Sequence, residues 1–260
     1  MVIDASGLGY AELNEKIRAS VGTVKITGCL GQRFIGAGMS DKSIEIEGIP
    51  GNAMGAYLNG ANITTSANAQ DAVGDTMNDG SIVIRGTVGD AVGYAMRGGQ
   101  IYVEKNAGYR AGIHMKEYKD KKPVIVIGGR AGSFLGEYQA GGIIIVLGLN
   151  DDNRPIVGNF PCTGMHGGKV FLRTDPSKLK LPKQVSARVA DQSDMEQAMP
   201  YIKRYCELFG ADEKALLSKS FTVITPDSKN PYKQMYVQNS TSSCSELDFV
   251  LFRTKLLSCK

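Results

Sequence analysis

The chain has 260 residues, 32 of them glycine and none tryptophan, and hydrophobic residues make up 42% of it. The glycines follow no G-X-Y period, which excludes a collagen-like chain. The net charge of +4 comes from 30 basic and 26 acidic residues dispersed along the sequence, whereas a nucleic-acid-binding protein needs a concentrated basic patch.

The sequence also gives expectations about location and cysteine chemistry. The N-terminal stretch MVIDASGLGYAELNEKIRAS has acidic residues early and lacks the apolar core of a signal peptide. The longest apolar run, 143–149, is too short to cross a bilayer. The five cysteines, at positions 29, 162, 206, 244 and 259, are widely spread and form no C-x-x-C pair. We therefore expect a cytoplasmic protein without membrane contact, disulfide framework, zinc ribbon or cysteine-ligated iron–sulfur cluster.

Residues 1–23 are predicted to form an N-terminal cap. Tyr10, Leu13 and Ile17 recur at helical spacing, which predicts a short amphipathic helix over 10–20 with these three residues on one face. A cap is expected because the region that follows is repetitive, and a stack of repeats must cover its open ends.

From residue 24 onward the chain repeats itself. Around Gly89, the apolar pair Ile82 and Ile84 comes seven and five residues earlier, while Gly93 follows by four residues and Met96 by seven. The same register recurs, with one extra residue in the first copy, around Gly31, Gly51, Gln70, Gly108 and Gly132. Successive anchors are therefore 20, 19, 19, 19 and 24 residues apart, and GGKVFLRTD (167–175) adds one more unit.

Each unit holds a short strand of alternating apolar residues, followed by turns rich in Gly, Asn and Asp. A unit this short cannot enclose a core alone, but units stacked at about 4.8 Å would align their Ile and Val side chains and pair every strand with the next. Helical hairpin repeats need about 33 residues and crossover units about 30. We predict an all-β fold, a right-handed parallel β-helix over 24–175 with short capping helices, mainly C-terminal.

The glycines of the repeat are interpreted as structural corners, because glycine tolerates positive φ. The predicted corners are Gly31, Gly51, Gly55, Gly74, Gly89, Gly93, Gly108, Gly112, Gly132 and Gly136. Neither GLGYAE nor GAGMSDKS completes the dinucleotide-binding pattern G-x-G-x-x-G. The methionines at offset seven (Met39, Met77, Met96 and Met115) are expected to stack inside, with a Met-rich ligand groove as the alternative.

The region 176–236 is predicted to be a C-terminal strap followed by helices. DPSKLKLPKQ suggests an irregular, basic strap. SDMEQAMPYIKRYCELFG predicts a helix with a capping box at Ser193 and Glu196, a restart at Pro200 and an end at Gly210. A second helix is expected over 212–218, then an extended segment over 220–236. Residues 237–260 form a tail that could be disordered, a partner-binding strand, or an addition to the natural chain.

No catalytic, cofactor-binding or metal-binding residues are predicted. The two histidines, His114 and His166, occupy turn positions of the repeat without the spacing of a metal pair. Asp71, Asp75 and Asp79 could cluster, as in carbohydrate-cleaving β-helix enzymes, but turn chemistry explains aspartates at these positions equally well.

Several segments carry a likeness to a known family. "GNAMGAYLNGANI", "ANAQDAVGDTMNDGSIVIRG", "GDAVGYAMRGGQIYVEKNAGYRAGIHMKEY" and "PVIVIGGRAGSFLGEYQAGGIIIVLGL" closely resemble the C-terminal G-x-G-x-G domain of the glutamate synthase large subunit. The likeness is to the stand-alone form found where that subunit is split into separate polypeptides. "FPCTGMHGGKVFLR" and "FTVITPDSKNPYKQMY" look like the same subfamily, so the resemblance covers roughly residues 1–236.

This resemblance implies a right-handed β-helix without catalytic residues, serving as a structural subunit of an oxidoreductase complex in glutamate biosynthesis and nitrogen metabolism. It implies as partners a glutaminase-type amidotransferase subunit and an FMN-binding synthase subunit, with FMN and iron–sulfur clusters on the partners and no cofactor in this chain. Related repeats occur in the β-helical subunit of formylmethanofuran dehydrogenase and in an N-methylglutamate synthase subunit, which are the alternatives. A polysaccharide-active enzyme and a self-associating solenoid are further alternatives from other classes.

Two segments break the period, the charged insert 116–122 and the loop 150–161, and are therefore expected to project from the solenoid. Insertions in repeat proteins often map to a binding face. The predicted partner-contact residues are Lys116, Glu117, Tyr118, Lys119, Asp120, Asn153 and Arg154.

Overall fold

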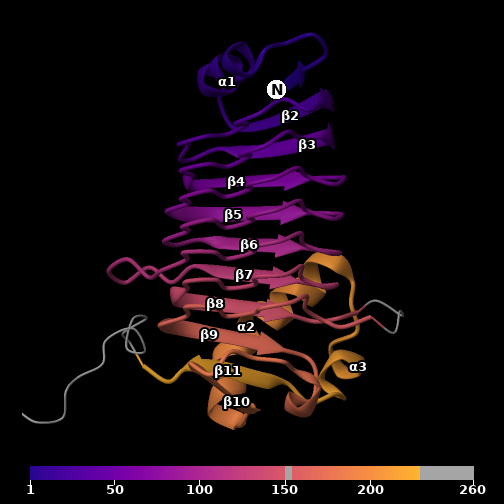
Figure 1. Cartoon of the computed structure of the whole chain (residues 1–260). Coiled ribbons are helices and arrows are strands. Elements are labelled where there is room, and N and C mark those ends of the chain that lie inside the picture. Colours follow the sequence, from indigo (N-terminus) through magenta and orange to yellow (C-terminus); the bar gives the residue numbers. More distant parts are fainter. Residues whose placement is uncertain (150–153, 229–260) are drawn as a thin grey trace, which may run out of the picture.

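The computed structural model describes residues 1–149 and 154–228. Within these residues, eleven strands form one sheet in the order β1-β2-β3-β4-β5-β6-β7-β8-β9-β11-β10 (Figure 1). All pairs from β1 to β9 are parallel, and the last two pairs are antiparallel. The predicted parallel β-solenoid is confirmed, with about 8 turns.

The strands along the solenoid are short, and the helices lie at the two ends of the chain. The strands are β1 (Val2–Asp4), β2 (Thr23–Leu30), β3 (Ser43–Ile49), β4 (Asn59–Thr65), β5 (Asp79–Ile84), β6 (Gln100–Val103), β7 (Val124–Ile127), β8 (Ala140–Val146), β9 (Gly167–Leu172), β10 (Val185–Val189) and β11 (Thr222–Pro226). The helices are α1 (Tyr10–Ala19), α2 (Gln192–Phe209) and α3 (Glu213–Leu217), with a single 3₁₀ turn η1 (Pro176–Lys178).

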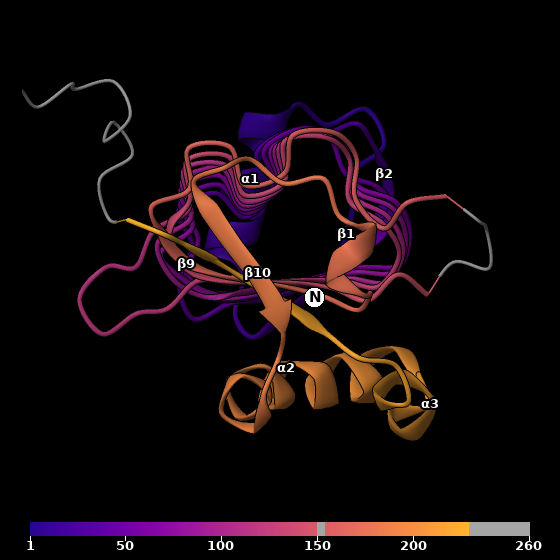
Figure 2. The same cartoon turned by 60° about the horizontal axis from the view of Figure 1, so that its bottom comes forward.

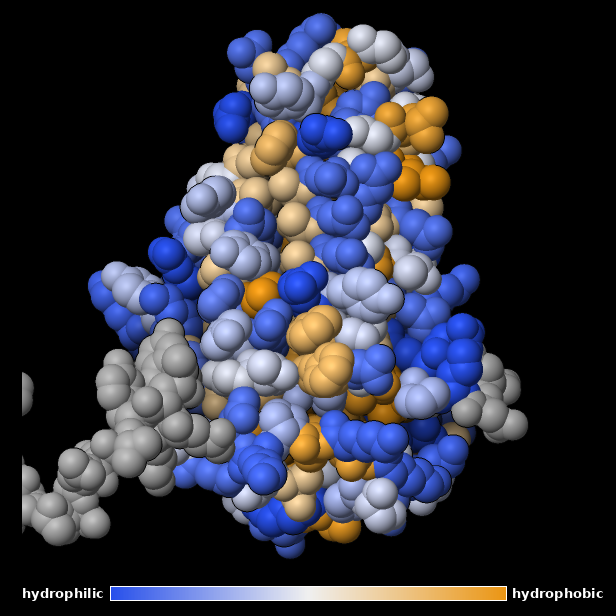
Figure 3. Space-filling view, in the orientation of Figure 1, coloured by the Kyte–Doolittle hydropathy of each residue, from blue (hydrophilic) through white to orange (hydrophobic). Residues whose placement is uncertain are grey.

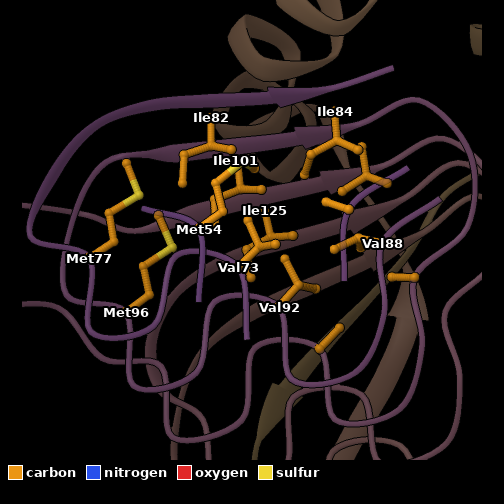
Figure 4. Close-up of a cluster of buried hydrophobic side chains, with 14 of the residues drawn as sticks. Met54, Val73, Met77, Ile82, Ile84, Val88, Val92, Met96, Ile101 and Ile125 are labelled. Carbon is orange, nitrogen blue, oxygen red and sulfur yellow. The ribbon is translucent and has the colours of Figure 1, made fainter. Parts of the chain in front are cut away.

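The interior is a set of aliphatic columns. Ile82, Ile101 and Ile125 pair in register on β5, β6 and β7, and all three are fully buried (Figure 4). Met77 and Met96 stack beside them in the same picture, and the four methionines at offset seven are all buried, as predicted. Burial of each such side chain stabilises the fold by about 1.5–3 kcal/mol, so the stack of coils forms one continuous core.

The face opposite the sheet has an alternating left-handed backbone. In one coil Ala91, Gly93 and Ala95 have φ of 57°, 68° and 50°. The N–H groups of Ala91 and Ala95 donate to carbonyls of the following coil at 2.7 and 2.8 Å. The N–H group of Gly93, between them, donates to the preceding coil at 2.8 Å. The described residues include 15 non-glycine positions with positive φ, a conformation costing about 1–2 kcal/mol each. The hydrogen bonds between coils offset that cost.

The predicted corner glycines fall into two conformational groups. Six have positive φ: Gly31, Gly55, Gly74, Gly93, Gly112 and Gly136. A Cβ atom at Gly93 would also lie 2.4 Å from Cδ1 of Ile125, inside the core. The other four, Gly51, Gly89, Gly108 and Gly132, do not have positive φ but lie against the preceding coil. A Cβ at Gly89 would lie 2.0 Å from Oδ1 of Asp71, so a close approach of coils requires glycine there.

The N-terminal end is covered by α1. Its Leu13 and Ile17 are buried against the first coils, which confirms the predicted helix. Tyr10, however, is 56% exposed, so its predicted place on the buried face is wrong. It lies at the start of the helix, where its ring packs against Phe34 at 5.7 Å between centroids. Asn14 ties the helix to the solenoid by accepting a hydrogen bond from Gly36 N–H.

The C-terminal end is closed by strands. β11 pairs antiparallel with β9, and β10 pairs with β11. The irregular strap predicted from DPSKLKLPKQ ends at Gln184, and the strand that follows it, β10, was not predicted. The physical reason is the free edge of β9, whose unpaired backbone groups need partners that the next coil no longer supplies.

α2 begins and continues differently from the prediction. Its N-cap is Asp191, which forms a capping box with Asp194, so the predicted box at Ser193 and Glu196 is wrong. Asp194 is favoured because its carboxylate also binds Lys169 at 2.9 Å, a contact that the sequence does not reveal. The helix does not restart at Pro200, which is exposed and lies within the continuous helix. Its end at Gly210, with φ of 70°, and the second helix α3 are confirmed.

α2 lies along the outer side of the sheet (Figure 2). It forms a second core with outward-facing strand residues, among them Tyr102, Val126, Ile145 and Phe171, all 1% exposed or less. Tyr205 of α2 donates from its hydroxyl to the carbonyl of Glu104 at 2.8 Å, which fixes the helix against the coils. The C-terminal coils are therefore buried on both faces of the sheet.

Candidate interaction surfaces

The insert 116–122 is a small, ordered projection between β6 and β7. Tyr118 and Lys121 pair across it as an antiparallel bridge, with backbone N–H to carbonyl distances of 3.2 and 3.1 Å. Figures 1 and 2 show this segment extending away from the side of the solenoid. The insert thus presents its tip to solvent on a folded turn.

Two contacts hold the base of the insert. Lys121 Nζ lies 2.8 Å from Oδ2 of Asp79, and Glu117 Oε1 accepts a hydrogen bond from Gly142 N–H at 3.1 Å. All five predicted contact residues of this insert are exposed: Lys116, Glu117, Tyr118, Lys119 and Asp120. Lys119 places its ammonium group 5.5 Å from the centre of the Tyr118 ring. The tip therefore combines an exposed aromatic ring with charge, which suits a protein contact.

The second predicted contact segment is only partly described. Asn153 lies outside the described residues, together with 150–152, while Arg154 is exposed. Figure 2 shows the insert 116–122 on one side of the solenoid and the chain that leaves β8 on the other side. The two predicted segments are therefore not brought together into one surface.

The face opposite the sheet, which we call the corner face, carries a row of rings that was not predicted from the sequence. The ring of His114 stacks on Tyr138 with 5.2 Å between centroids, and it forms a T-shaped pair with Tyr94 at 6.0 Å. Arg110 likewise lies over Phe134, which stacks on Phe160. Figure 3 shows that the face opposite the sheet is largely hydrophilic, with a narrow apolar column along the coils. The sequence did hold a sign of this stacking, because His114 and Tyr138 occupy the same offset in neighbouring repeat units.

A cavity of about 890 Å³ lies at the C-terminal end of the coils. One wall is the last coil, including Val157 and Phe160, and another is the strap segment 178–182. Arg173 and Lys219 also line it. Arg173 is held by two backbone carbonyls, donating from Nε to Leu216 at 2.8 Å and from Nη1 to Leu147 at 3.2 Å. Sequence reasoning missed this site because its walls come from segments that lie far apart in the chain.

The thiols of the described coils are poorly suited to nucleophilic chemistry. Burial raises the pKa of Cys29 to about 11 and that of Cys162 to about 12, so both are protonated thiols at neutral pH. His166 lies in a turn, with Nδ1 3.0 Å from the carbonyl oxygen of Gly164.

The acidic corner residues are engaged within the fold. Asp71 Oδ1 accepts from Asp90 N–H, Asp75 from the Thr76 hydroxyl, and Asp79 from Lys121. Over residues 1–149 and 154–228, no three His, Cys, Asp or Glu side chains are grouped as metal ligands would be. The helices in the same ranges include none that is long and apolar enough to span a membrane.

Stacked coils with glycine corners, a sheet covered on one side by a helix and projecting loops define a parallel β-solenoid protein. The sequence profile of the GXGXG motif matches residues 11–228, and the chain belongs to this family, whose domain is found in the glutamate synthase large subunit. One curated relative, an uncharacterized protein from Methanocaldococcus jannaschii, is 47% identical over 250 residues, which cover 91% of this chain and 96% of that protein.

Proposed function

We propose that the protein is a non-catalytic structural subunit of a glutamate-synthase-type complex, in which it positions a glutaminase-type amidotransferase subunit and an FMN-binding synthase subunit. The observation that carries the proposal is the GXGXG match across residues 11–228, which include almost every coil. FMN and iron–sulfur clusters would reside on the partner subunits, where glutamine-derived ammonia is transferred to 2-oxoglutarate.

The hydrogen-bonded stacking of the coils supports a role as a rigid spacer between partner subunits. Backbone hydrogen bonds link neighbouring coils on the sheet and on the corner face, for example Gly93 N–H to the Val73 carbonyl. Such a stack resists bending, and a rigid support keeps two active sites at a fixed separation. The insert 116–122 and the chain that leaves β8 lie on different sides of the solenoid (Figure 2), so each side is available to a different partner.

The test of this function is assembly together with activity. The protein is co-expressed with a glutaminase-type amidotransferase subunit and an FMN-binding synthase subunit, which are expected to be encoded near its gene, and a complex is expected to co-elute on size-exclusion chromatography. The purified chain alone is expected neither to release ammonia from glutamine nor to bind FMN stoichiometrically. Either activity in the isolated chain would overturn the structural role.

The contact role of the insert has its own test. Deleting residues 117–121, or changing Tyr118 and Lys119 to alanine, is expected to weaken assembly while the β-rich circular dichroism stays intact. An exposed aromatic anchor is worth about 2 kcal/mol or more in an interface, so the affinity is expected to fall about 30-fold. Tyr57→Ala with Lys25→Ala is the matched control, since both residues are exposed on other coils. Unchanged association would remove the insert from the interface.

The alternatives within the family differ in their partners. A chain that serves in formylmethanofuran dehydrogenase or in N-methylglutamate synthase would co-purify with the catalytic subunits of those enzymes instead. Identification of co-purifying proteins by mass spectrometry therefore separates these functions from the proposed one.

A further inference from the structure

The corner face of the solenoid carries two columns of backbone donors directed along the axis. In the first column, each N–H donates to the carbonyl of the following coil; Ala91, Arg110 and Phe134 do so at 2.7 to 2.9 Å. In the second column Val88, Ala107 and Ala131 donate in the same direction at 2.9 to 3.1 Å. Every coil therefore uses the next coil as the acceptor for these groups.

The columns end in the cavity at the C-terminal end. Phe160 follows Phe134 in the first column, and Val157 pairs with Ala131 in the second. No further coil follows them, and neither N–H has a hydrogen-bond acceptor among the described residues. Both residues line the cavity. An unpaired buried backbone donor costs about 1–3 kcal/mol, and Val157 is 8% exposed, so an acceptor bound there would stabilise the protein.

The side chains that complete the cavity are cationic. Lys178 and Lys180 of the strap, Arg173 after β9 and Lys219 after α3 line it, and its described lining includes no Asp or Glu. None of the three lysines forms an ion pair with another described residue. Arg130 and Arg154 also line the cavity, and each of these residues has an interaction of its own. The described lining of this cavity is thus positively charged.

The size and apolar parts of the cavity indicate more than a small inorganic ion. Its volume of about 890 Å³ is within the range of pockets for small organic ligands. Ile156, Leu179 and Leu181 contribute apolar surface between the cations. These three residues pack against the solenoid core, which gives the cavity a fixed wall.

The geometry points to a binding site for an organic anion with at least two negative charges, a polycarboxylate or an organic phosphate. Its anionic oxygens accept hydrogen bonds from the Val157 and Phe160 N–H groups and from Arg173, while Lys178, Lys180 and Lys219 surround the charge. Carboxylate and phosphate oxygens share this chemistry. The inference does not depend on the proposed function, because it rests only on the end of the solenoid.

The test is isothermal titration calorimetry of the full chain at low ionic strength. Citrate and adenosine diphosphate are the two probes, and adenosine is the uncharged control. Saturable one-to-one binding of citrate, the diphosphate or both is expected, and it should weaken as salt is added. The stronger of the two identifies the carboxylate or the phosphate source. Binding of adenosine alone, or no saturable binding by either anion, would overturn the proposal.

Variants of the strap localise the site. Lys178→Ala with Lys180→Ala is expected to raise the Kd about tenfold or more, since two charged donors are removed. Lys183→Ala is the matched control, because Lys183 is exposed on the same strap but does not line the cavity; its Kd should change less than about twofold. An equal effect of the control would show non-specific attraction and contradict the site.

A backbone readout tests the unpaired donors directly. In ¹H–¹⁵N spectra titrated with the tighter probe, the amide signals of Val157 and Phe160 are expected to move most, because their N–H groups gain an acceptor. The amides of Ala131 and Phe134, which already donate to the last coil, serve as internal references. Binding that leaves the Val157 and Phe160 signals unchanged would place the anion elsewhere.

Discussion

The N-terminal and C-terminal coils have the same inner face but different outer faces. One column of outward-facing residues runs Lys25, Glu45, Thr64 on β2 to β4 and continues as Val83, Tyr102, Val126, Ile145, Phe171 on β5 to β9. Lys25 and Glu45 are exposed, whereas the five residues from Val83 to Phe171 are buried. α2 covers the apolar part of this column and leaves the polar part in water (Figure 2).

This difference shows that the repeat determines the inner face of each coil, whereas the residue at one outward position determines whether a helix packs on the outer face. The inner columns do not change, because each coil must fill the same interior. The outer face is free to vary, since a solenoid strand needs only one buried face. Stability in a solenoid is close to a sum over repeats and their interfaces. We therefore expect the C-terminal coils to be the more stable half.

The largest expected effect comes from the outward column itself. Phe171→Ala removes a fully buried aromatic ring between β9 and α2 and is expected to cost about 3–5 kcal/mol of unfolding free energy. Glu45→Ala, at the matching position of an N-terminal coil, should stay within about 0.5 kcal/mol. Urea unfolding of both variants measures the difference. Equal losses would mean that α2 does not create a second core.

The inner face should respond equally in both halves. Gly55 and Gly112 have φ of 69° and 70°, and a Cβ would lie 2.5 Å from Ile82 Cδ1 in one case and 2.4 Å from Ile144 Cδ1 in the other. Each Gly→Ala change is expected to cost about 2–4 kcal/mol, from left-handed strain and overpacking. Ala95→Gly, which relieves the same strain, is the control and should be neutral or stabilising. A large difference between the Gly55→Ala and Gly112→Ala variants in chemical unfolding would contradict a shared interior.

A fall in pH is expected to lower the stability of the C-terminal half before that of the N-terminal half. Burial alone would raise the pKa of Asp194, but the bonds from Lys169 and Arg188 outweigh it and lower that pKa. A lowered folded-state pKa gives stability that is present above the unfolded value of about 3.9 and is lost as the pH falls through the folded value. Asp194→Asn is expected to cost about 1–3 kcal/mol at pH 7.

The measurement is urea unfolding between pH 7 and pH 2.5. The loss of stability below about pH 4 should be smaller in the Asp194→Asn variant than in the wild type. Glu12→Gln is the control in the N-terminal half, because its ion pair with Lys16 is exposed on α1. An acid profile that Asp194→Asn leaves unaltered would show that this carboxylate does not link α2 docking to pH.

The smallest expected effect is the loss of one hydrogen bond. Tyr205→Phe removes the donor to the Glu104 carbonyl and is expected to cost about 1–2 kcal/mol. The change should appear as faster amide exchange in α2 while β2 and β3 stay unaffected. Tyr57→Phe, at an exposed tyrosine, is the control. Acceleration throughout the solenoid would show that α2 is not a separate unit.

The inner fold was predictable because its signals are local. The pairs such as Ile82 and Ile84 repeat in register, and that register is the pairing found in the sheet. The sequence also held a sign of the covered outer face, since VIVI (124–127) and IIIV (143–146) lose the alternation of an exposed strand. The capping box was less accessible. Ser193 and Asp191 both fit the spacing, and a contact with Lys169 from a distant strand favours the second.

The closure of the C-terminal end and the cationic cavity could not be predicted, because both depend on segments that meet only in space. β11 pairs with β9 although α2 and α3 separate the two strands in the sequence. Lys178 and Lys219 line one cavity from segments that are also far apart in the chain. The partner contacts in the insert and around Arg154 remain predictions, and Asn153 lies outside the described residues.

Hydrogen exchange along the intact solenoid tests the account most directly. Mass spectrometry of the native protein should show the amides of β7, β8 and β9 exchanging more slowly than those of β2, β3 and β4, because only the former have a second core on their outer face. Truncation of the Tyr205 and Phe171 side chains to alanine should bring the two sets of rates together. Equal protection of both halves in the wild type, or faster exchange in β7 to β9, would contradict the account.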